Sequence, residues 1–133
     1  MKYLLDTNVC IVFLNERSER LKRRLLMQHS HELAVCSVVK AELFYGAMKS
    51  INPTKAIQKQ HYFLNHFISL PFDDNAAQHY GEIRAALAKQ GQPIGPNDFM
   101  IAAIALSHNL TLVTHNTREF SRIPHLTIED WEA

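Results

Sequence analysis

Three acidic side chains stand at positions where a folded chain would turn them inward. Asp6 directly follows the apolar run at residues 3–5, which has the character of a buried strand. Glu42 lies on the apolar stripe of a helix expected over residues 37–48, and Asp98 opens a similar stripe at helical spacing. Taken singly, each acid is explained as well by a helix cap or by the helix dipole. Together they indicate a shared acidic pocket.

Such a pocket carries negative charge that needs compensation. Two carboxylates about 4 Å apart repel by roughly 4 kcal/mol at the effective dielectric of a protein surface, and burying an unpaired carboxylate is costly by itself. No Lys or Arg stands at an obvious neutralising position in these inward stripes. The pocket must therefore take up protons or bind a hard divalent cation. Mg²⁺ and Mn²⁺ both accept carboxylate and water oxygens in octahedral geometry.

Other chemistries lack their motifs. The sequence contains no G-x-x-x-x-G-K-[ST] or G-x-G-x-x-G phosphate loop, no H-E-x-x-H zinc motif and no G-x-S-x-G nucleophile elbow. Asn8 stands where a phosphatase that works through an aspartyl-phosphate carries its second aspartate. Cys10 and Cys36 are too few and too distant for a Cys-rich zinc site, and both are expected to be reduced and inert. The eight histidines are expected at surface or core positions.

Length and composition describe one ordinary globular domain. The 133 residues are 47% hydrophobic and 20% charged, which excludes a largely disordered or collagen-like chain. The longest unbroken apolar stretch, residues 100–106, is far shorter than the ~20 residues that span a bilayer. Asp6 interrupts the apolar start too early for a signal peptide. We therefore expect a cytoplasmic protein with no membrane partner.

Short apolar runs alternate with longer helical patterns along the whole chain. Strands are expected at residues 3–5, 33–36, 68–70, 111–113 and, at the sheet edge, 126–128. Helices are expected at residues 9–14, 18–28, 37–48, 54–67, 74–90 and 96–109, with Ser37, Thr54 and either Asp73 or Asp74 as caps and Pro96 in a first turn. This alternation is typical of the α/β class, with a mostly parallel sheet covered on both faces. Ligands of such sheets bind beyond the carboxyl ends of the strands, where the strand order reverses.

Four segments together resemble the PIN-domain ribonucleases. They are L-L-D-T-N, which contains Asp6, S-V-V-K-A-E-L-F-Y-G-A, which contains Glu42, G-P-N-D-F-M-I-A-A, which contains Asp98, and L-V-T-H-N-T-R-E-F. The chain looks most like the VapC-type toxins of bacterial type II toxin–antitoxin pairs, over essentially its full length. The resemblance implies a single PIN domain over residues 1–133, a PIN-like α/β/α sandwich with a mostly parallel sheet of four to five strands.

The same resemblance implies a function. Members of this family are Mg²⁺- or Mn²⁺-dependent endoribonucleases, and their usual targets are structured RNAs such as tRNA. The expected reaction is metal-assisted hydrolysis of an RNA phosphodiester that leaves a 5′-phosphate and a 3′-hydroxyl. The expected partners are the RNA substrate, a small cognate antitoxin protein that inhibits the toxin, and a second copy of the chain in a homodimer.

By the same resemblance, Asp6, Glu42 and Asp98 hold the metal. Many PIN domains carry a fourth acid just after the fourth strand, where this chain reads T-H-N, and the T-x-N-x-x-E-F form resembles a VapC subgroup in which the Glu takes that role. Glu119 is therefore the expected fourth acid; a solvent-facing acid beside Arg118, or Asn116 in its place, are the open alternatives. The expected catalytic set is Asp6, Glu42, Asp98 and Glu119, with Thr7, Asn8, Thr114 and Asn116 as supporting residues that orient it.

Two further patterns bear on partners. The net charge is only +1, but a basic run holds Arg17, Arg20, Lys22, Arg23 and Arg24 against a single acid. This run, with the scattered Lys49, Lys55 and Lys59, is either a set of RNA-backbone contacts or a solvated helix face. The aromatic residues Phe44, Tyr45, Tyr62, Phe63 and Phe67 either belong to the core, form a homodimer face or line a groove for an antitoxin helix.

Two competing functions are kept beside the nuclease. A PIN-like fold that has lost turnover would act as an RNA- or protein-binding module, an alternative that the absent fourth Asp opens. A phosphotransfer receiver would need paired acids near Asp6 and an aspartate directly after the third strand, whereas Leu70 is followed by Pro71 and Phe72. The receiver is therefore the weaker of the two.

Overall fold

A five-stranded parallel sheet forms the centre of the computed structural model, which describes residues 1–133. Its strands are β1 (Tyr3–Leu5), β2 (Leu33–Cys36), β3 (Ile68–Leu70), β4 (Thr111–Val113) and β5 (Ile128–Glu129), in the spatial order β3-β2-β1-β4-β5. Leu4 of β1 pairs with Ala34 of β2 on one side and with Leu112 of β4 on the other. All three side chains are fully buried, which explains why these strands read as continuous apolar runs.

The strand order reverses at β1. The chain first builds β2 and β3 on one side of β1 and then crosses to build β4 and β5 on the other side. The carboxyl ends of β1 and β4 therefore lie next to each other at the point where α/β sheets most often bind ligands.

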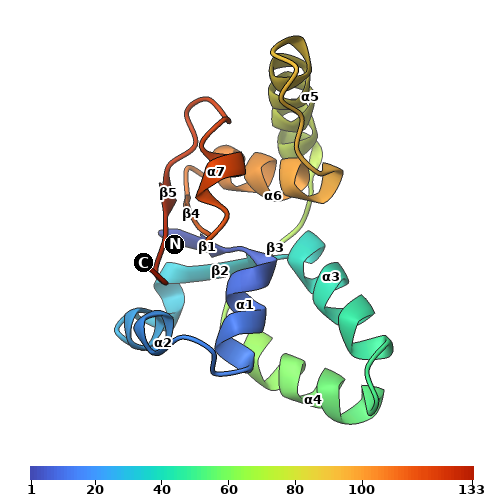
Figure 1. The fold of residues 1–133 in the computed structure, drawn as a ribbon, viewed down its shortest axis with the longest axis vertical. Helices are drawn as coiled ribbons and strands as arrows, with labels where there is room; N and C mark the ends of the chain where they lie inside the picture. The colour runs from blue at the N-terminus through green and yellow to red at the C-terminus, as the bar shows by residue number, and fades with distance from the viewer.

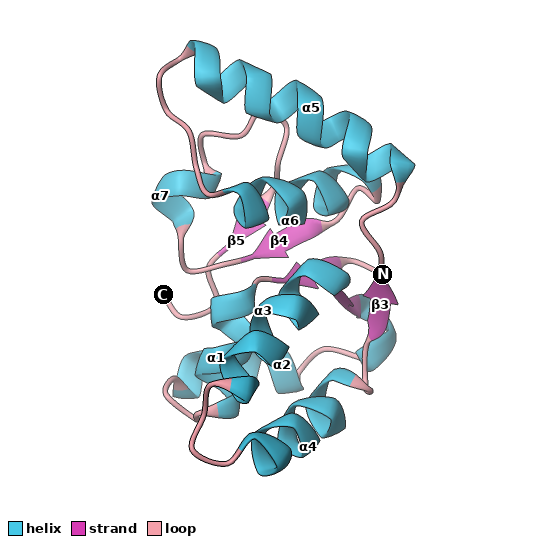
Figure 2. Ribbon diagram, turned by 90° about the vertical axis from the view of Figure 1, so that its right-hand side faces the viewer, coloured by secondary structure: helices cyan, strands magenta, loops and turns pink.

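Helices cover both faces of the sheet, as expected for an α/β/α sandwich (Figures 1 and 2). They are α1 (Thr7–Leu14), α2 (Glu19–Leu26), α3 (Ser37–Met48), α4 (Pro53–Leu64), α5 (Asp74–Lys89), α6 (Pro96–Ser107) and α7 (Thr117–Phe120), with a 3₁₀ turn at Ser30–Glu32. In Figure 2, α1 to α4 lie below the strands and α5 to α7 lie above them. None of the helices has the length and apolar character needed to cross a lipid bilayer.

Several expected helix starts are confirmed. Asp73 accepts a hydrogen bond from the Ala76 N–H at 2.9 Å and so caps α5. Pro96 is the first residue of α6, where its missing N–H costs no helical hydrogen bond.

Cys10 and Cys36 are free and buried, and burial raises the pKa of both thiols, to about 11 for Cys36, as expected of inert cysteines.

Other expected boundaries are wrong. Ser37 is the first residue of α3 rather than its cap, because the backbone is still extended at Cys36 and turns helical only after it. Asn52, not Thr54, caps α4, because Pro53 occupies the first helical position and the Asn52 side chain accepts from Lys55 N–H. α1 begins earlier than expected, α6 ends at Ser107, and the edge strand is shifted to Ile128–Glu129. The short helix α7 is not among the expected elements, although a helix start at Glu119 is one of the open alternatives for that residue.

Candidate functional site

Asp6 lies at the junction between β1 and α1, and its side chain is almost fully buried. Its Oδ1 atom accepts a hydrogen bond from the N–H of Thr7 at 2.8 Å, which caps α1. Its Oδ2 atom accepts a hydrogen bond from the Thr114 hydroxyl at 2.8 Å, directly after β4. Burial raises the pKa of Asp6, these two hydrogen bonds lower it, and the nearby Glu42 raises it further; the net shift is upward.

Glu42 reaches the same place from α3, where it is half-buried. The hydroxyl of Thr7 donates a short hydrogen bond of 2.6 Å to Oε1 of Glu42. Thr7 therefore bonds both acids, with its N–H to Asp6 and its O–H to Glu42. This bridge holds together two side chains that are 36 residues apart in the sequence.

The segment after β4 contributes further polar residues to the site. The backbone N–H of Asn116 donates to the Thr114 hydroxyl oxygen at 3.0 Å, and its side-chain Nδ2 donates to Oε2 of Glu119 at 3.2 Å. Glu119 lies on the first turn of α7 and is half-buried. A continuous hydrogen-bond chain thus connects Glu42, Thr7, Asp6, Thr114, Asn116 and Glu119.

Asp98 completes the cluster from the first turn of α6. Burial raises the pKa of its carboxyl to about 6, and the negative charges of Asp6, Glu42 and Glu119 raise it as well. Every contribution acts in the same direction, and none of the four acids forms an ion pair with a Lys or Arg. The four carboxylates therefore form one electrostatically coupled and uncompensated cluster.

The supporting residues expected from the sequence divide into two groups. Thr7 and Thr114, together with Asp6, are the only polar residues of the protein that are buried as whole residues, and all three lie at this site. Asn116 was considered as a substitute for Glu119, but the structure brings both residues to the site together. Asn8 is different: its side chain is exposed on α1 and makes no hydrogen bond to any of the acids.

The donor set of the cluster fits a hard divalent cation. Its acids offer only carboxylate oxygens, the ligand type that Mg²⁺ and Mn²⁺ prefer over the sulfur and nitrogen donors of zinc sites. Burial raises the pKa of Asp6 and of Asp98, and neighbouring acids raise both further, so a positive charge at the cluster, from a proton or a cation, is favoured. The cluster therefore has the charge and the type of ligand that such a cation requires, although no three of its carboxylates bring their oxygens within 4.8 Å of one another.

The coupling of these acids predicts how Asp98 titrates. In EDTA, the carboxyl carbon of Asp98 should report a pKa of about 6 by NMR, against an ordinary value of 3.8. Asp6→Asn should lower that pKa, because it removes one neighbouring negative charge. Asp74→Asn, a substitution of an exposed acid at the start of α5, is the matched control and should leave it unchanged. A pKa near 4 in the parent protein would contradict the cluster.

The same shift has a consequence for stability. Between pH 3.8 and about 6 the folded chain keeps a proton on Asp98 that the unfolded chain has already released. In EDTA, the free energy of unfolding should therefore fall as pH rises through this window, and Asp98→Asn should flatten the fall. Denaturant titrations at several pH values measure both curves.

Comparison with known proteins agrees with this geometry. The PIN domain family profile matches residues 3–126. The tRNA(fMet)-specific endonuclease VapC of Salmonella typhimurium is 42% identical over 131 residues, which cover 98% of each chain. The crystal structure of DNA-bound VapBC from the same organism superposes with a TM-score of 0.93 at 42% identity, again over 98% of each chain. A member of the VapBC family of toxin–antitoxin systems, VapBC-5 from Mycobacterium tuberculosis, superposes with a TM-score of 0.70 at 27% identity, over 96% of this chain and 95% of that one. The chain belongs to the PIN-domain family and, within it, to the VapC-type proteins.

Proposed function

We propose that the protein is a Mg²⁺- or Mn²⁺-dependent endoribonuclease toxin that hydrolyses phosphodiesters of structured RNA such as tRNA. The observation that carries the proposal is the convergence of four uncompensated carboxylates at the carboxyl edge of the sheet. The Salmonella relative is a tRNA(fMet)-specific endonuclease, which supports both the reaction and the class of RNA.

In this proposal Asp6, Glu42 and Asp98 hold the cation. When bound, a divalent cation lowers the pKa of water, orients it toward the scissile bond and neutralises charge that builds up on the phosphate. Thr7 and Thr114 fix both oxygens of Asp6 in place, so the ligand geometry does not depend on a mobile side chain. Glu42 or Asp98 takes up the proton of the attacking water, and Asn116 holds the Glu119 carboxylate at the rim.

The substrate path that we propose runs over α2. Arg17, Arg20, Arg23 and Arg24 are all exposed. Arg20, Arg23 and Arg24 line a hollow of about 350 Å³ with Trp131 and the C-terminal Ala133. Arg24 also pairs with Glu129 at 3.2 Å and lies over the Trp131 ring, so part of its role is structural. Arg20 and Arg23 form no ion pair with an acid and are the cleaner candidates for RNA phosphates.

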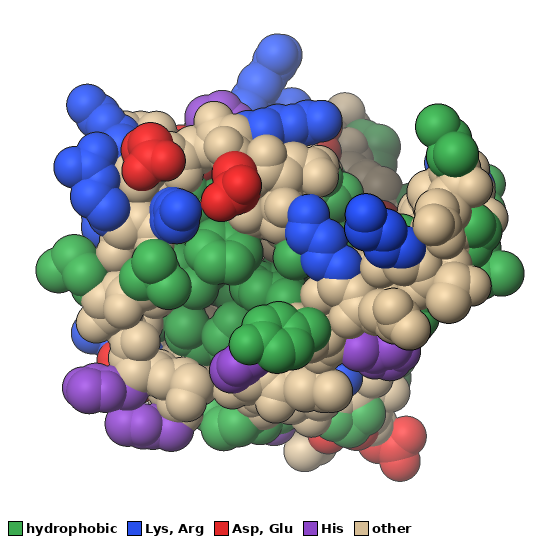
Figure 3. Space-filling model, turned by 90° about the horizontal axis from the view of Figure 1, so that it is seen from below, with side chains coloured by type: hydrophobic (Ala, Val, Ile, Leu, Met, Phe, Trp, Pro, Cys, Tyr) green, Lys and Arg blue, Asp and Glu red, His purple; other side chains and the backbone are tan.

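We propose an apolar groove as the binding site of the antitoxin. This groove, of about 510 Å³, lies between α1, α2 and α4, and none of the four acids lines it. Figure 3 shows apolar side chains gathered in a hollow of this face, with basic side chains around it. Leu26 and Tyr62 stand at the groove with most of their surface exposed, and with the groove they form a contiguous apolar patch of the kind that marks interaction sites.

The chemistry of the groove fits an amphipathic helix of the antitoxin. Phe13, Leu25 and Phe63 offer an apolar floor, and Lys59 offers positive charge for acidic residues beside the apolar stripe of the helix. Lys22 is already paired with Glu16 at 3.5 Å. Of the aromatic residues noted in the sequence, Tyr62, Phe63 and Phe67 line the groove, whereas Phe44 packs against the core and Tyr45 is exposed elsewhere. The known structure of a member of the VapBC family of toxin–antitoxin systems supports an antitoxin as the partner.

Cleavage of tRNA in Mg²⁺ should depend on the acidic cluster. Asp6→Asn should reduce the rate at least about a hundredfold, and Thr114→Val roughly ten- to a hundredfold, because the first removes a ligand charge and the second removes only its support. Asp74→Asn is the matched control and should retain full activity. If wild type and Asp6→Asn cleave equally, or if activity survives excess EDTA, the nuclease proposal fails. If the protein binds RNA but does not cleave it, the alternative function, an RNA-binding module without turnover, is supported instead.

RNA affinity should depend on salt through α2. The double variant Arg20→Ala/Arg23→Ala should weaken RNA binding and flatten the dependence of log Kd on log salt, because fewer counterions are displaced. Lys89→Ala, at the end of α5, is the control and should leave the slope as it is. An unchanged slope in the double variant would place the RNA on another surface.

Antitoxin binding should depend on the groove. Leu26→Glu should weaken the complex at least about tenfold, because it places an unpaired charge against apolar surface. Ile51→Glu, which lies in the exposed turn between α3 and α4 outside the groove, should have no effect. Size-exclusion chromatography and calorimetry with the co-expressed antitoxin test both variants. Equal losses in the two variants would argue against the groove.

A further inference from the structure

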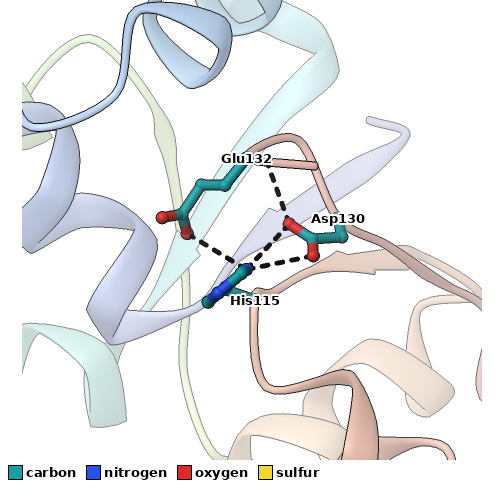
Figure 4. Close-up of side chains that lie close together, drawn as sticks. All are labelled: His115, Asp130 and Glu132. Carbon is teal, nitrogen blue, oxygen red and sulfur yellow. Dashed lines mark hydrogen bonds and ion pairs between the residues drawn. The ribbon is translucent and has the colours of Figure 1, made fainter.

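A second group of ligating side chains lies outside the acidic cluster. His115 follows Thr114 in the segment after β4, while Asp130 and Glu132 belong to the C-terminal segment after β5 (Figure 4). The ring nitrogen Nδ1 of His115 is 3.2 and 3.0 Å from the two carboxylate oxygens of Asp130, and 4.0 Å from Oε2 of Glu132. The three ligand atoms, one from each residue, all lie within 4.8 Å of one another.

This group contains an unsatisfied polar atom. Oε2 of Glu132 is buried and has no hydrogen-bond partner, and it faces the His115 ring at a distance beyond a hydrogen bond. The side chains of Asp130 and Glu132 are only 18% and 16% exposed, so water compensates little of their charge. A buried carboxylate oxygen without a partner is costly and therefore requires an explanation.

The spacing of the three ligand atoms fits a divalent cation. In a tetrahedral shell with metal–ligand bonds of about 2.0 to 2.2 Å, the ligand atoms lie roughly 3.3 to 3.6 Å apart. The separations of 3.0 and 4.0 Å around His115 Nδ1 lie within about half an ångström of this range. The His115 side chain is 63% exposed, so a cation reaches the group from solvent without any rearrangement of the core.

We propose that His115, Asp130 and Glu132 form a second cation site that takes a borderline divalent metal such as Zn²⁺. Imidazole together with carboxylates selects such a metal over Mg²⁺, which prefers an all-oxygen shell. The three side chains leave the remaining coordination positions to water. This site is chemically distinct from the acidic cluster, whose acids supply only carboxylate oxygens.

The position of the site gives it a structural effect. It joins the C-terminal segment to the segment after β4, and that segment carries Thr114 and Asn116, which hold Asp6 and Glu119. A cation bound to His115 therefore stabilises the backbone on which two residues of the acidic cluster's hydrogen-bond chain depend. Its binding energy adds to the stability of the folded chain.

Zinc titration of untagged protein tests the site. The parent is the Asp6→Asn/Asp98→Asn double variant, which removes two of the four carboxylates of the acidic cluster and so weakens any binding there. ZnCl₂ is titrated by calorimetry after EDTA is removed. The expected result is one Zn²⁺ per chain and a rise in Tm. His115→Asn and, separately, Glu132→Gln should each weaken binding at least about tenfold and abolish the rise in Tm. His125→Asn, in the loop before β5, is the matched control and should bind as the parent does.

Two outcomes would overturn the proposal. One is the absence of a stoichiometric Zn²⁺ in the parent, which would leave His115 as a simple ion-pair partner of Asp130. The other is unchanged affinity in Glu132→Gln, which would assign the bound zinc to other surface histidines. Circular dichroism checks that each variant is folded. If His115→Asn does not fold, the zinc affinity of Glu132→Gln alone tests the site.

Discussion

Repulsion among like charges is the constraint on which the rest of this structure depends. The parallel topology brings the ends of β1 and β4 together, and α3 and α6 add their own acids at the same edge. As a result, the pKa of the Asp98 carboxyl, which burial raises, is raised further by the charges of Asp6, Glu42 and Glu119, with no basic side chain to oppose them. Under the proposed function, a bound divalent cation offsets this electrostatic cost.

Hydrogen bonds from neutral groups make the arrangement possible. Thr7 and Thr114 donate to Asp6 and Glu42 without adding charge, so they fix the acids while leaving the field of the cluster negative. Arginines at the same positions would neutralise the acids and so remove the negative field that would attract a cation. The buried polar residues of the protein are consequently two threonines and one aspartate, all at the site.

Most of the fold follows from local sequence pattern, and the errors have local causes. Four strands are predictable because each is a short apolar run bounded by polar residues. The exact caps are not, because Ser37 and Cys36, or Asn52 and Thr54, are equally plausible until the backbone conformation is known. The inward direction of Asp6 and Glu42 is visible in the sequence, whereas the Thr7 bridge between them depends on tertiary structure. His115 shows no pattern at all, since its partners lie in an irregular C-terminal segment.

The most direct test of the central claim is the position of a bound cation. Crystals of the protein grown with Mn²⁺ and measured at the manganese absorption edge would show an anomalous peak wherever the ion resides. The account requires a peak within coordination distance of Asp6 and of at least one of Glu42 and Asp98. An empty acidic cluster at a Mn²⁺ concentration that supports RNA cleavage would contradict it.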